Sequence, residues 1–157
     1  MNTVLFACIH NAGRSQMAAA FFSAFVDPAK AVAVSAGTQP GECVHPEVIE
    51  VMREVGIDLR LQRPQKLTDQ LARDASLLVT MGCGDECPYV PGLQRDDWPL
   101  EDPKARPLDH VRRIRDEIRD RVFQLLDAHA WRRDDVTGCT QLIDKVQWAS
   151  TRYSGSR

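Results

Sequence analysis

The stretch TVLFACIHNAGRSQMAAAFFSAF (residues 3–25) decides the fold, because it passes from a strand pattern to a helix pattern through one short loop. Residues 3–8 form a short run of β-branched, aromatic and other apolar residues, which predicts a buried strand. Residues 14–25 are rich in Ala, Met and Phe and stop before Asp27-Pro28, which predicts a helix. A loop between a strand and a helix N-terminus gathers backbone N–H groups, and the helix dipole there favours anions.

The remaining chain repeats this alternation of strands and helices. The sequence predicts strands over residues 31–37 and 76–81, and a short fourth strand that includes Trp98 and Leu100. Strands that alternate with helices form βαβ units with right-handed crossovers. We therefore predict an α/β fold of three layers, in which a four-stranded parallel sheet is flanked by helices.

Three further helices are predicted after the first. One covers residues 45–56 with Gly56 as its stop signal, and a short one runs from its cap, Thr68, through Asp74. The third is long and capped by Asp109, and its polar face mixes Arg with Asp and Glu, which indicates a solvated surface. The apolar positions of this helix are Val111, Ile114, Ile118, Val122, Leu125 and Leu126.

Length and composition limit the possible functions. The chain has 157 residues, of which 43% are hydrophobic and 27% charged, as is typical of one soluble globular domain. A net charge of −2 argues against a general binder of nucleic acid or of membrane surfaces. The N-terminus has no cationic leader and its apolar run is too short for a signal or a span, so we expect a cytoplasmic protein. We expect a monomer with its domain over residues 1–129 and a C-terminal extension over residues 130–157 whose end is disordered.

The loop after the first strand carries the residue types of a nucleophilic oxyanion site. Ala12 and Gly13 are small enough for the backbone to curl around a bound group, and Arg14 adds a planar fork of donors that suits a tetrahedral oxyanion. Cys8 is expected to point into this electropositive loop, which favours the thiolate nucleophile. The alternative is a core cysteine beside a surface arginine, but the order of strand, loop and helix favours the chemical interpretation.

Neighbouring loop residues support this prediction. Ser15 can donate a hydrogen bond to the sulfur, Asn11 can fix the loop by bonding backbone groups, and His10 is expected at the rim. The loop backbone would bind the oxyanion together with the arginine. The predicted oxyanion-binding residues are Ile9, His10, Asn11, Ala12, Gly13 and Arg14.

The chain resembles a known family from residue 3 to about 128. The loop CIHNAGRSQMA resembles the phosphate-binding loop of low-molecular-weight protein tyrosine phosphatases and, more closely, that of the arsenate reductases that share their fold. The resemblance implies a fold of the low-molecular-weight phosphatase type. The other matching motifs follow in the family's order: SAGT (35–38), VHPEVIEVMREVGIDL (44–59), VTMGCGDECP (79–88), DWPLEDP (97–103) and VRRIRDEI (111–118).

The cysteines bear on the choice between these two chemistries. Both reactions begin with a thiolate that attacks a tetrahedral oxyanion, but a reductase also needs two electrons, which thiol–disulfide exchange can supply. The resemblance to thioredoxin-coupled arsenate reductases implies that Cys8 attacks arsenate, Cys83 attacks Cys8 to release arsenite, and Cys87 passes the disulfide outward to thioredoxin. Cys83 follows a predicted strand, as Cys8 does, so both are expected at the same edge of the sheet.

Alternatives stay open for the later cysteines. Cys83 and Cys87 could bind structural zinc, but the sequence offers only His110 nearby as a further ligand. They are closer together than in several family members, and the reductant could instead be a low-molecular-weight thiol with a glutaredoxin-like partner. Cys43 and Cys139 lie outside every motif and are expected to be bystanders.

The motif DWPLEDP places Asp102 before Pro103, where the family has the general acid that protonates the leaving oxygen. An aspartate before proline is otherwise a common turn residue. The motif continues as DPKA, without the tyrosines of the phosphatases, which speaks against a phosphotyrosine substrate. Some family members hold potassium through an asparagine that matches Asn11, but Ala19 stands where they have a carboxylate, so we predict no metal and no cofactor.

The resemblance therefore implies an arsenate reductase whose partners are an arsenate- or phosphate-like oxyanion and thioredoxin or a related thiol reductant. Two other functions stay open. One is a low-molecular-weight phosphatase that acts on a small phosphoester, and the other is a non-enzymatic thiol site that binds arsenite. The predicted catalytic residues are Cys8, Arg14, Ser15, Cys83, Cys87 and Asp102.

Overall fold

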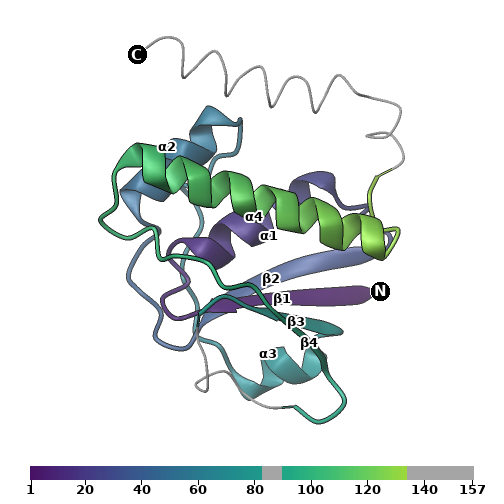
Figure 1. Ribbon diagram of the computed structural model, residues 1–157. Coiled ribbons are helices and arrows are strands. Elements are labelled where there is room, and N and C mark those ends of the chain that lie inside the picture. The colour runs from purple at the N-terminus through teal and green to yellow at the C-terminus, as the bar shows by residue number, and fades with distance from the viewer. Residues whose placement is uncertain (83–89, 134–157) are drawn as a thin grey trace.

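The computed structural model describes residues 1–82 and 90–133 and shows a four-stranded sheet between helices (Figure 1). All neighbouring strands pair in parallel, in the order β2-β1-β3-β4. The predicted α/β fold with a four-stranded parallel sheet is confirmed. The elements are β1 (Asn2–Cys8), α1 (Arg14–Phe25), β2 (Ala31–Gly37), α2 (Pro46–Glu54), α3 (Asp69–Asp74), β3 (Leu77–Thr80), β4 (Gln94–Asp97) and α4 (Leu108–Ala128).

Different helices cover the two faces of the sheet. In Figure 1, α1, α2 and α4 lie over one face and α3 lies over the other. Side chains of β1 alternate between the two layers: Val4 and Phe6 join the core under α1 and α4, whereas Leu5 and Ala7 join the smaller core under α3. Cys8 continues the first set, so the end of β1 places its sulfur on the face that α1 covers.

The predicted ends of α1 and α3 agree with the structure, whereas α2 ends at Glu54, two residues before the predicted stop at Gly56, and α4 has a different cap. Thr68 caps α3 through its hydroxyl oxygen, which accepts the N–H of Leu71 at 3.2 Å. The predicted cap of α4, Asp109, is wrong, because the cap residue is Pro107. Asp109 instead lies in the first turn, where its carboxylate bonds to Arg112 and interacts favourably with the helix dipole.

The fourth strand lies earlier in the chain than predicted. β4 covers Gln94–Asp97, and Trp98 and Leu100 follow it with buried side chains. β4 is an edge strand that pairs with β3 through its backbone, and its side chains are exposed. Such a strand needs no apolar residues, and charged residues protect an exposed edge, so its hydrophilic sequence carries no strand signal.

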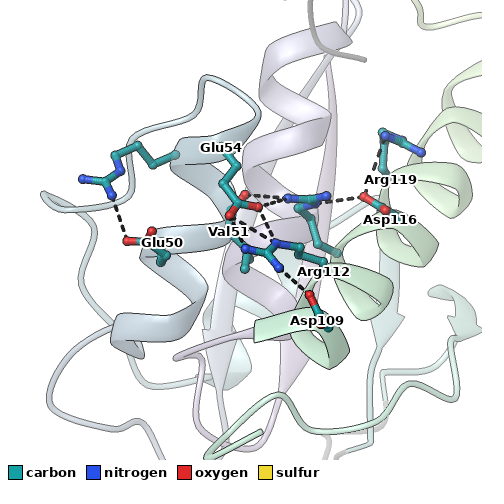
Figure 2. Close-up of polar contacts among 9 residues, drawn as sticks. Glu50, Val51, Glu54, Asp109, Arg112, Asp116 and Arg119 are labelled. Carbon is teal, nitrogen blue, oxygen red and sulfur yellow. Dashed lines mark hydrogen bonds and ion pairs between the residues drawn. The ribbon is translucent and has the colours of Figure 1, made fainter. Parts of the chain in front are cut away.

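The charged face of α4 is not wholly solvated, which corrects the prediction. Arg115 is only 2% exposed, and it donates to the Glu54 carboxylate at 2.9 Å and to the carbonyl oxygen of Val51 at 2.9 Å. Arg112 donates to the same carboxylate at 2.7 Å, as Figure 2 shows. This network joins α4 to α2, and its acid could not be identified from the pattern of α4 alone.

The last described residues pack on the core. Trp131 stacks on His129 and meets the ring of Phe22 edge to face. The boundary at residue 129 and the disordered end of the extension stay predictions, because residues 134–157 lie outside the described ranges. In the part of the chain that the structure describes, no helix combines the length and the apolar character needed to cross a membrane.

Candidate active site

The loop between β1 and α1 curls around the sulfur of Cys8. Cys8 Sγ accepts a hydrogen bond from the backbone N–H of Asn11 at 3.2 Å, and it lies 2.9 Å from the hydroxyl oxygen of Ser15. Residues 9–13 are not helical, and Asn11 has a φ of +51°, a left-handed conformation that asparagine tolerates better than most residues. The chain therefore reverses just after Cys8 and brings the N–H of Asn11 back toward the sulfur.

Asn11 connects this loop to its surroundings. Its side-chain Nδ2 donates to the hydroxyl oxygen of Ser15 at 2.7 Å, and its Oδ1 accepts the backbone N–H of Gln65 at 3.0 Å. Gln16 Nε2 donates to the backbone carbonyl of Asn11 at 3.1 Å. Because the Ser15 oxygen already accepts from Asn11, its own proton is available to the sulfur of Cys8, which gives the sulfur a second donor.

Close backbone packing supports the loop from behind. A Cβ added to Gly37, at the end of β2, would lie 2.5 Å from the carbonyl oxygen of Ile9 and 2.9 Å from the backbone nitrogen of Asn11. A side chain there would displace the loop. Sequence reasoning missed Gln16 and Gln65 as supports of the loop; Gln65 is remote in the chain, whereas the position of Gln16 in the first turn of α1 could have indicated it.

The guanidinium of Arg14 lies in a narrow space beside the loop. It is 6% exposed, and its Nη1 donates to the carbonyl oxygen of Leu100 at 3.2 Å. Gly82 follows β3 and lies against the guanidinium of Arg14, since a Cβ on Gly82 would be 2.6 Å from Nη1. Asp102 Oδ2 lies 3.9 Å from Nη2. The structure therefore brings Arg14, Asp102 and the chain that leaves β3 to the edge of the sheet where Cys8 lies.

Asp102 sits on a turn that packs over the loop. Its Oδ1 accepts the backbone N–H of Lys104 at 3.0 Å, which is the turn role that aspartate commonly has before proline. Its other oxygen faces Arg14, and its side chain is 43% exposed. Pro103 covers Gly13 so closely that a Cβ on Gly13 would be 2.7 Å from the proline ring. One carboxylate thus shapes the turn and faces the guanidinium, so the two interpretations of Asp102 are compatible.

Two histidines lie at the rim of the site. The ring Nδ1 of His10 lies 3.0 Å from a backbone carbonyl oxygen of the segment that follows β2. His45 precedes α2 without capping it through its side chain, and its ring lies next to Gly13. Burial lowers the pKa of His45, and the nearby carboxylates of Glu47 and Asp102 oppose this shift only in part.

The structure describes two of the five cysteines. Cys8 is buried under the loop, and Cys43 is a free, exposed thiol on the segment that leads into α2. The others lie outside the described residues, so the roles predicted for them stay predictions. They are Cys83, Cys87 and Cys139.

In the described part of the chain, the side chains considered as metal ligands lie apart or are bonded to other protein groups. His110, considered as a partner for a zinc site, contacts the carboxylate of Glu101, and this hydrogen bond lowers the pKa of Glu101. The side-chain oxygen of Asn11 is occupied by the N–H of Gln65. Within residues 1–82 and 90–133, no three side chains of His, Cys, Asp or Glu form a group that could hold a metal ion.

Comparison with known proteins identifies the family to which this geometry belongs. Residues 3–136 match the model of the family described as low molecular weight phosphotyrosine protein phosphatase. The chain belongs to this family. The family membership and the fold of the low molecular weight phosphatase type, both expected from the loop motif, are confirmed.

Relatives of this chain within the low molecular weight phosphatase family are arsenate reductases. It is 34% identical over 129 residues to the glutaredoxin arsenate reductase of Synechocystis, covering 80% of this chain and 97% of the relative. It is 33% identical to an arsenate reductase of Staphylococcus aureus, covering 74% of this chain and 90% of the relative. A solved thioredoxin-dependent arsenate reductase of Corynebacterium glutamicum matches with a TM-score of 0.70 and 38% identity, over 82% of this chain. The present chain spans 61% of the length of that Corynebacterium protein.

Proposed function

We propose that this protein reduces arsenate to arsenite with Cys8 as the nucleophile. The observation that supports this best is a buried thiol in a loop whose N–H groups, adjoining helix N-terminus and arginine all suit a tetrahedral oxyanion. Relatives that share the loop's family are arsenate reductases, which favours arsenate over a phosphoester as the substrate. Reduction of arsenate needs two electrons, and the loop holds one thiol, Cys8. Thiols outside the loop therefore complete the supply of electrons by thiol–disulfide exchange.

In the first step, the thiolate of Cys8 attacks arsenic and one oxygen leaves. Arg14 and the loop N–H groups bind the remaining oxygens, where charge-assisted hydrogen bonds are strongest. Asp102, whose carboxylate faces Arg14 at 3.9 Å, protonates the leaving oxygen, which departs as water. The arsenic is now bonded to sulfur and has not yet been reduced.

In the second step, the thiolate of Cys83 attacks the sulfur of Cys8. A Cys8–Cys83 disulfide forms, the sulfur–arsenic bond breaks, and its electron pair stays on arsenic, which leaves as arsenite. Cys87 then attacks Cys83, which frees the thiolate of Cys8 and leaves a Cys83–Cys87 disulfide. The sequence order supports this relay, because Cys83 follows Gly82, which lies against the guanidinium of Arg14.

Thioredoxin is the reductant that we propose for the final disulfide. Two thiols beyond Cys8 favour an internal relay that ends in a protein disulfide, and one relative is described as thioredoxin-dependent. Another relative is described as a glutaredoxin arsenate reductase, so glutathione with glutaredoxin is the competing reductant.

Arsenate-dependent consumption of NADPH through thioredoxin and its reductase tests the proposal. We expect steady consumption with the wild type, none with Cys8→Ser, and unchanged consumption with Cys43→Ser, which alters an exposed thiol outside the loop. Turnover only with glutathione and glutaredoxin would show that glutaredoxin, and not thioredoxin, is the reductant. If neither system supports turnover, arsenate reduction is contradicted.

The relay makes different predictions for the two later cysteines. Cys83→Ser should stop before any internal disulfide forms, so that arsenite is released only with an added thiol. Cys87→Ser should complete one turnover and then retain a Cys8–Cys83 disulfide, which mass mapping after a single turnover can detect. Full thioredoxin-coupled turnover by Cys87→Ser would exclude the relay.

The acid role of Asp102 is tested by Asp102→Asn, which keeps the hydrogen-bond acceptor of the turn but cannot supply the proton. A positioned acid contributes about 10²–10⁴-fold, so the rate of the first step should fall by a factor in that range. Protection of Cys8 from alkylation by inorganic phosphate should be unchanged, since the loop is intact. A variant as fast as the wild type at every pH would leave Asp102 with its turn role alone.

A phosphatase acting on a small phosphoester is the second candidate, because the matching family is described by that activity. Lys104 and Ala105 follow Asp102-Pro103 where the resemblance would place tyrosines, which disfavours an aromatic phosphoester. Release of phosphate from p-nitrophenyl phosphate measures this activity, and a kcat/KM above that for arsenate would reverse the assignment. Stoichiometric binding of arsenite without any turnover would instead indicate a thiol binding site.

A further inference from the structure

The turn of residues 102–105 is attached to α2 through the side chain of Glu47. Glu47, in the first turn of α2, accepts the backbone N–H of Ala105 on its Oε1 at 3.1 Å. Asp102 and Ala105 are the two ends of this turn, and Asp102 accepts the N–H of Lys104 between them. Glu47 therefore holds the turn at the end opposite to the carboxylate that faces the site.

The conformation of Ala105 makes this contact informative. Ala105 has a φ of +57°, and the left-handed region costs a residue that carries a Cβ roughly 1–2 kcal/mol. Such a conformation persists where the surrounding contacts impose it. A hydrogen bond to a carboxylate is stronger than one to a neutral acceptor, so the bond to Glu47 is suited to impose it.

The helix that carries Glu47 is itself fixed at both ends. At its N-terminal end, the backbone N–H of His45 donates to the carbonyl oxygen of Ala12 in the oxyanion loop at 2.9 Å. At its C-terminal end, Glu54 is bonded to two arginines of α4 (Figure 2). α2 thus connects the loop between β1 and α1 to α4, and Glu47 connects α2 to the turn that carries Asp102.

We propose that Glu47 is a positioning residue that keeps Asp102 within reach of the oxygen that it protonates. This inference rests on the proposed role of Asp102 as general acid. Glu47 does not touch the reacting atoms and acts through the N–H of Ala105. Proton transfer requires the acid at hydrogen-bond distance, so release of the turn slows the first chemical step without weakening oxyanion binding.

Three variants separate this role from a general effect on the fold. Glu47→Ala removes the acceptor of the Ala105 N–H, whereas Glu47→Gln keeps an oxygen acceptor and removes the charge. Glu50→Ala is the matched control, because it removes a carboxylate of the same helix that pairs with Arg53 at 2.8 Å.

The variants are compared in single turnover with arsenate. We expect Glu47→Ala to slow the first step by about 10- to 100-fold, since small misplacements of a reacting group cost rate in this range. Glu47→Gln should lose clearly less than Glu47→Ala, because it keeps a weaker, neutral acceptor for the Ala105 N–H, and Glu50→Ala should match the wild type. The amide of Ala105 should exchange with deuterium faster in Glu47→Ala alone, and protection of Cys8 by inorganic phosphate should be the same in all.

A double-mutant cycle with Asp102→Asn gives the deciding result. In that background Glu47→Ala should have no further effect on the rate, because the acid that Glu47 positions can no longer act. An additive loss, equal losses in Glu47→Gln and Glu47→Ala, or a loss of phosphate protection would overturn the inference while the function stands. A wild type that does not turn over arsenate would instead overturn the proposed function, and the role of Glu47 with it.

Discussion

Two arginines of this protein are almost completely buried, and their charges are compensated differently. Arg115, on α4, is 2% exposed and is bonded to the carboxylates of Glu54 at 2.9 Å and Asp116 at 2.8 Å. Arg14, at the start of α1, is 6% exposed, and the carboxylate of Asp102 lies 3.9 Å away. Among the residues that the structure describes, carboxylates neutralise the first guanidinium at short range and none comes as close to the second.

The difference in charge compensation indicates a structural role for Arg115 and a ligand-binding role for Arg14. A buried charge is costly unless partners compensate it, so Arg115 with its carboxylates forms a stable junction between α2 and α4. Among the described residues, Arg14 meets one carbonyl oxygen and a carboxylate at the limit of an ion pair. Its planar fork can therefore bind an anionic ligand, and a tetrahedral oxyanion in the loop would complete its compensation.

The largest effect is expected where compensation is removed from Arg115. Glu54→Ala deletes the carboxylate that Arg115 shares with Arg112, so that the buried guanidinium of Arg115 loses its buried partner and keeps the half-exposed carboxylate of Asp116. The free energy of unfolding in urea should fall by about 3–5 kcal/mol, because breaking a buried pair costs this much. Glu50→Ala breaks an exposed pair on the same helix and should change it by less than about 1 kcal/mol. Equal losses in the two variants would remove the distinction.

Replacement of the uncompensated arginine should affect activity rather than stability. Arg14→Lys keeps a positive charge but loses the planar fork, so kcat/KM for arsenate should fall by about 10²–10³-fold, as for loss of one donor to a developing oxyanion. The free energy of unfolding should change by less than about 1 kcal/mol. A loss of stability as large as that of Glu54→Ala would show that both arginines are structural.

Ser15→Ala tests whether the loop itself activates Cys8 beside the uncompensated arginine. The hydroxyl lies 2.9 Å from the sulfur, and a hydrogen bond to a charged group contributes about 1.5–3 kcal/mol. Alkylation of Cys8 by iodoacetamide at neutral pH should therefore slow by about 10- to 100-fold. Ser23→Ala, an exposed position on the same helix, is the control. Unchanged alkylation would show that the bond does not favour the thiolate.

The smallest expected effect concerns His45, whose ring lies next to Gly13 at the start of α2. Burial lowers the pKa of His45 in the folded protein below the usual value of 6.5. The unfolded chain therefore takes up the proton first, so stability is complete above that pH and is lost as the pH falls through it. His45→Asn removes this titration and introduces a capping residue for α2, which should add about 0.5–1 kcal/mol. Urea unfolding across this pH range should show a flatter pH dependence in the variant, and an identical slope would contradict the prediction.

The sequence predicted the parts of the molecule whose signals are local. The strand, loop and helix of residues 3–25 are adjacent in the chain, and each has its own periodicity or composition, so the position of Cys8 at the end of β1, before the loop that leads into α1, followed directly. Thr68 was identified as a cap because capping acts over three residues.

The contacts that sequence patterns missed join positions far apart in the chain. Gln65 supports Asn11, Glu47 holds the N–H of Ala105, and Arg115 lies against an acid of α2. No periodicity predicts such pairs, because each depends on how the layers pack. β4 was misplaced for a different reason, since a backbone-paired edge strand with exposed side chains has no hydrophobic pattern to detect.

The loop backbone approaches Gly37 so closely that the codon for this residue can hardly vary. Any change of a glycine codon that alters the residue adds at least a Cβ, and the atoms of the oxyanion loop lie 2.5 Å from where that carbon would be. Those atoms are backbone, so no alternative rotamer can make room. A saturation library read by survival on arsenate should therefore lose every substitution at this codon, although Gly37 itself carries no side chain that could take part in the reaction.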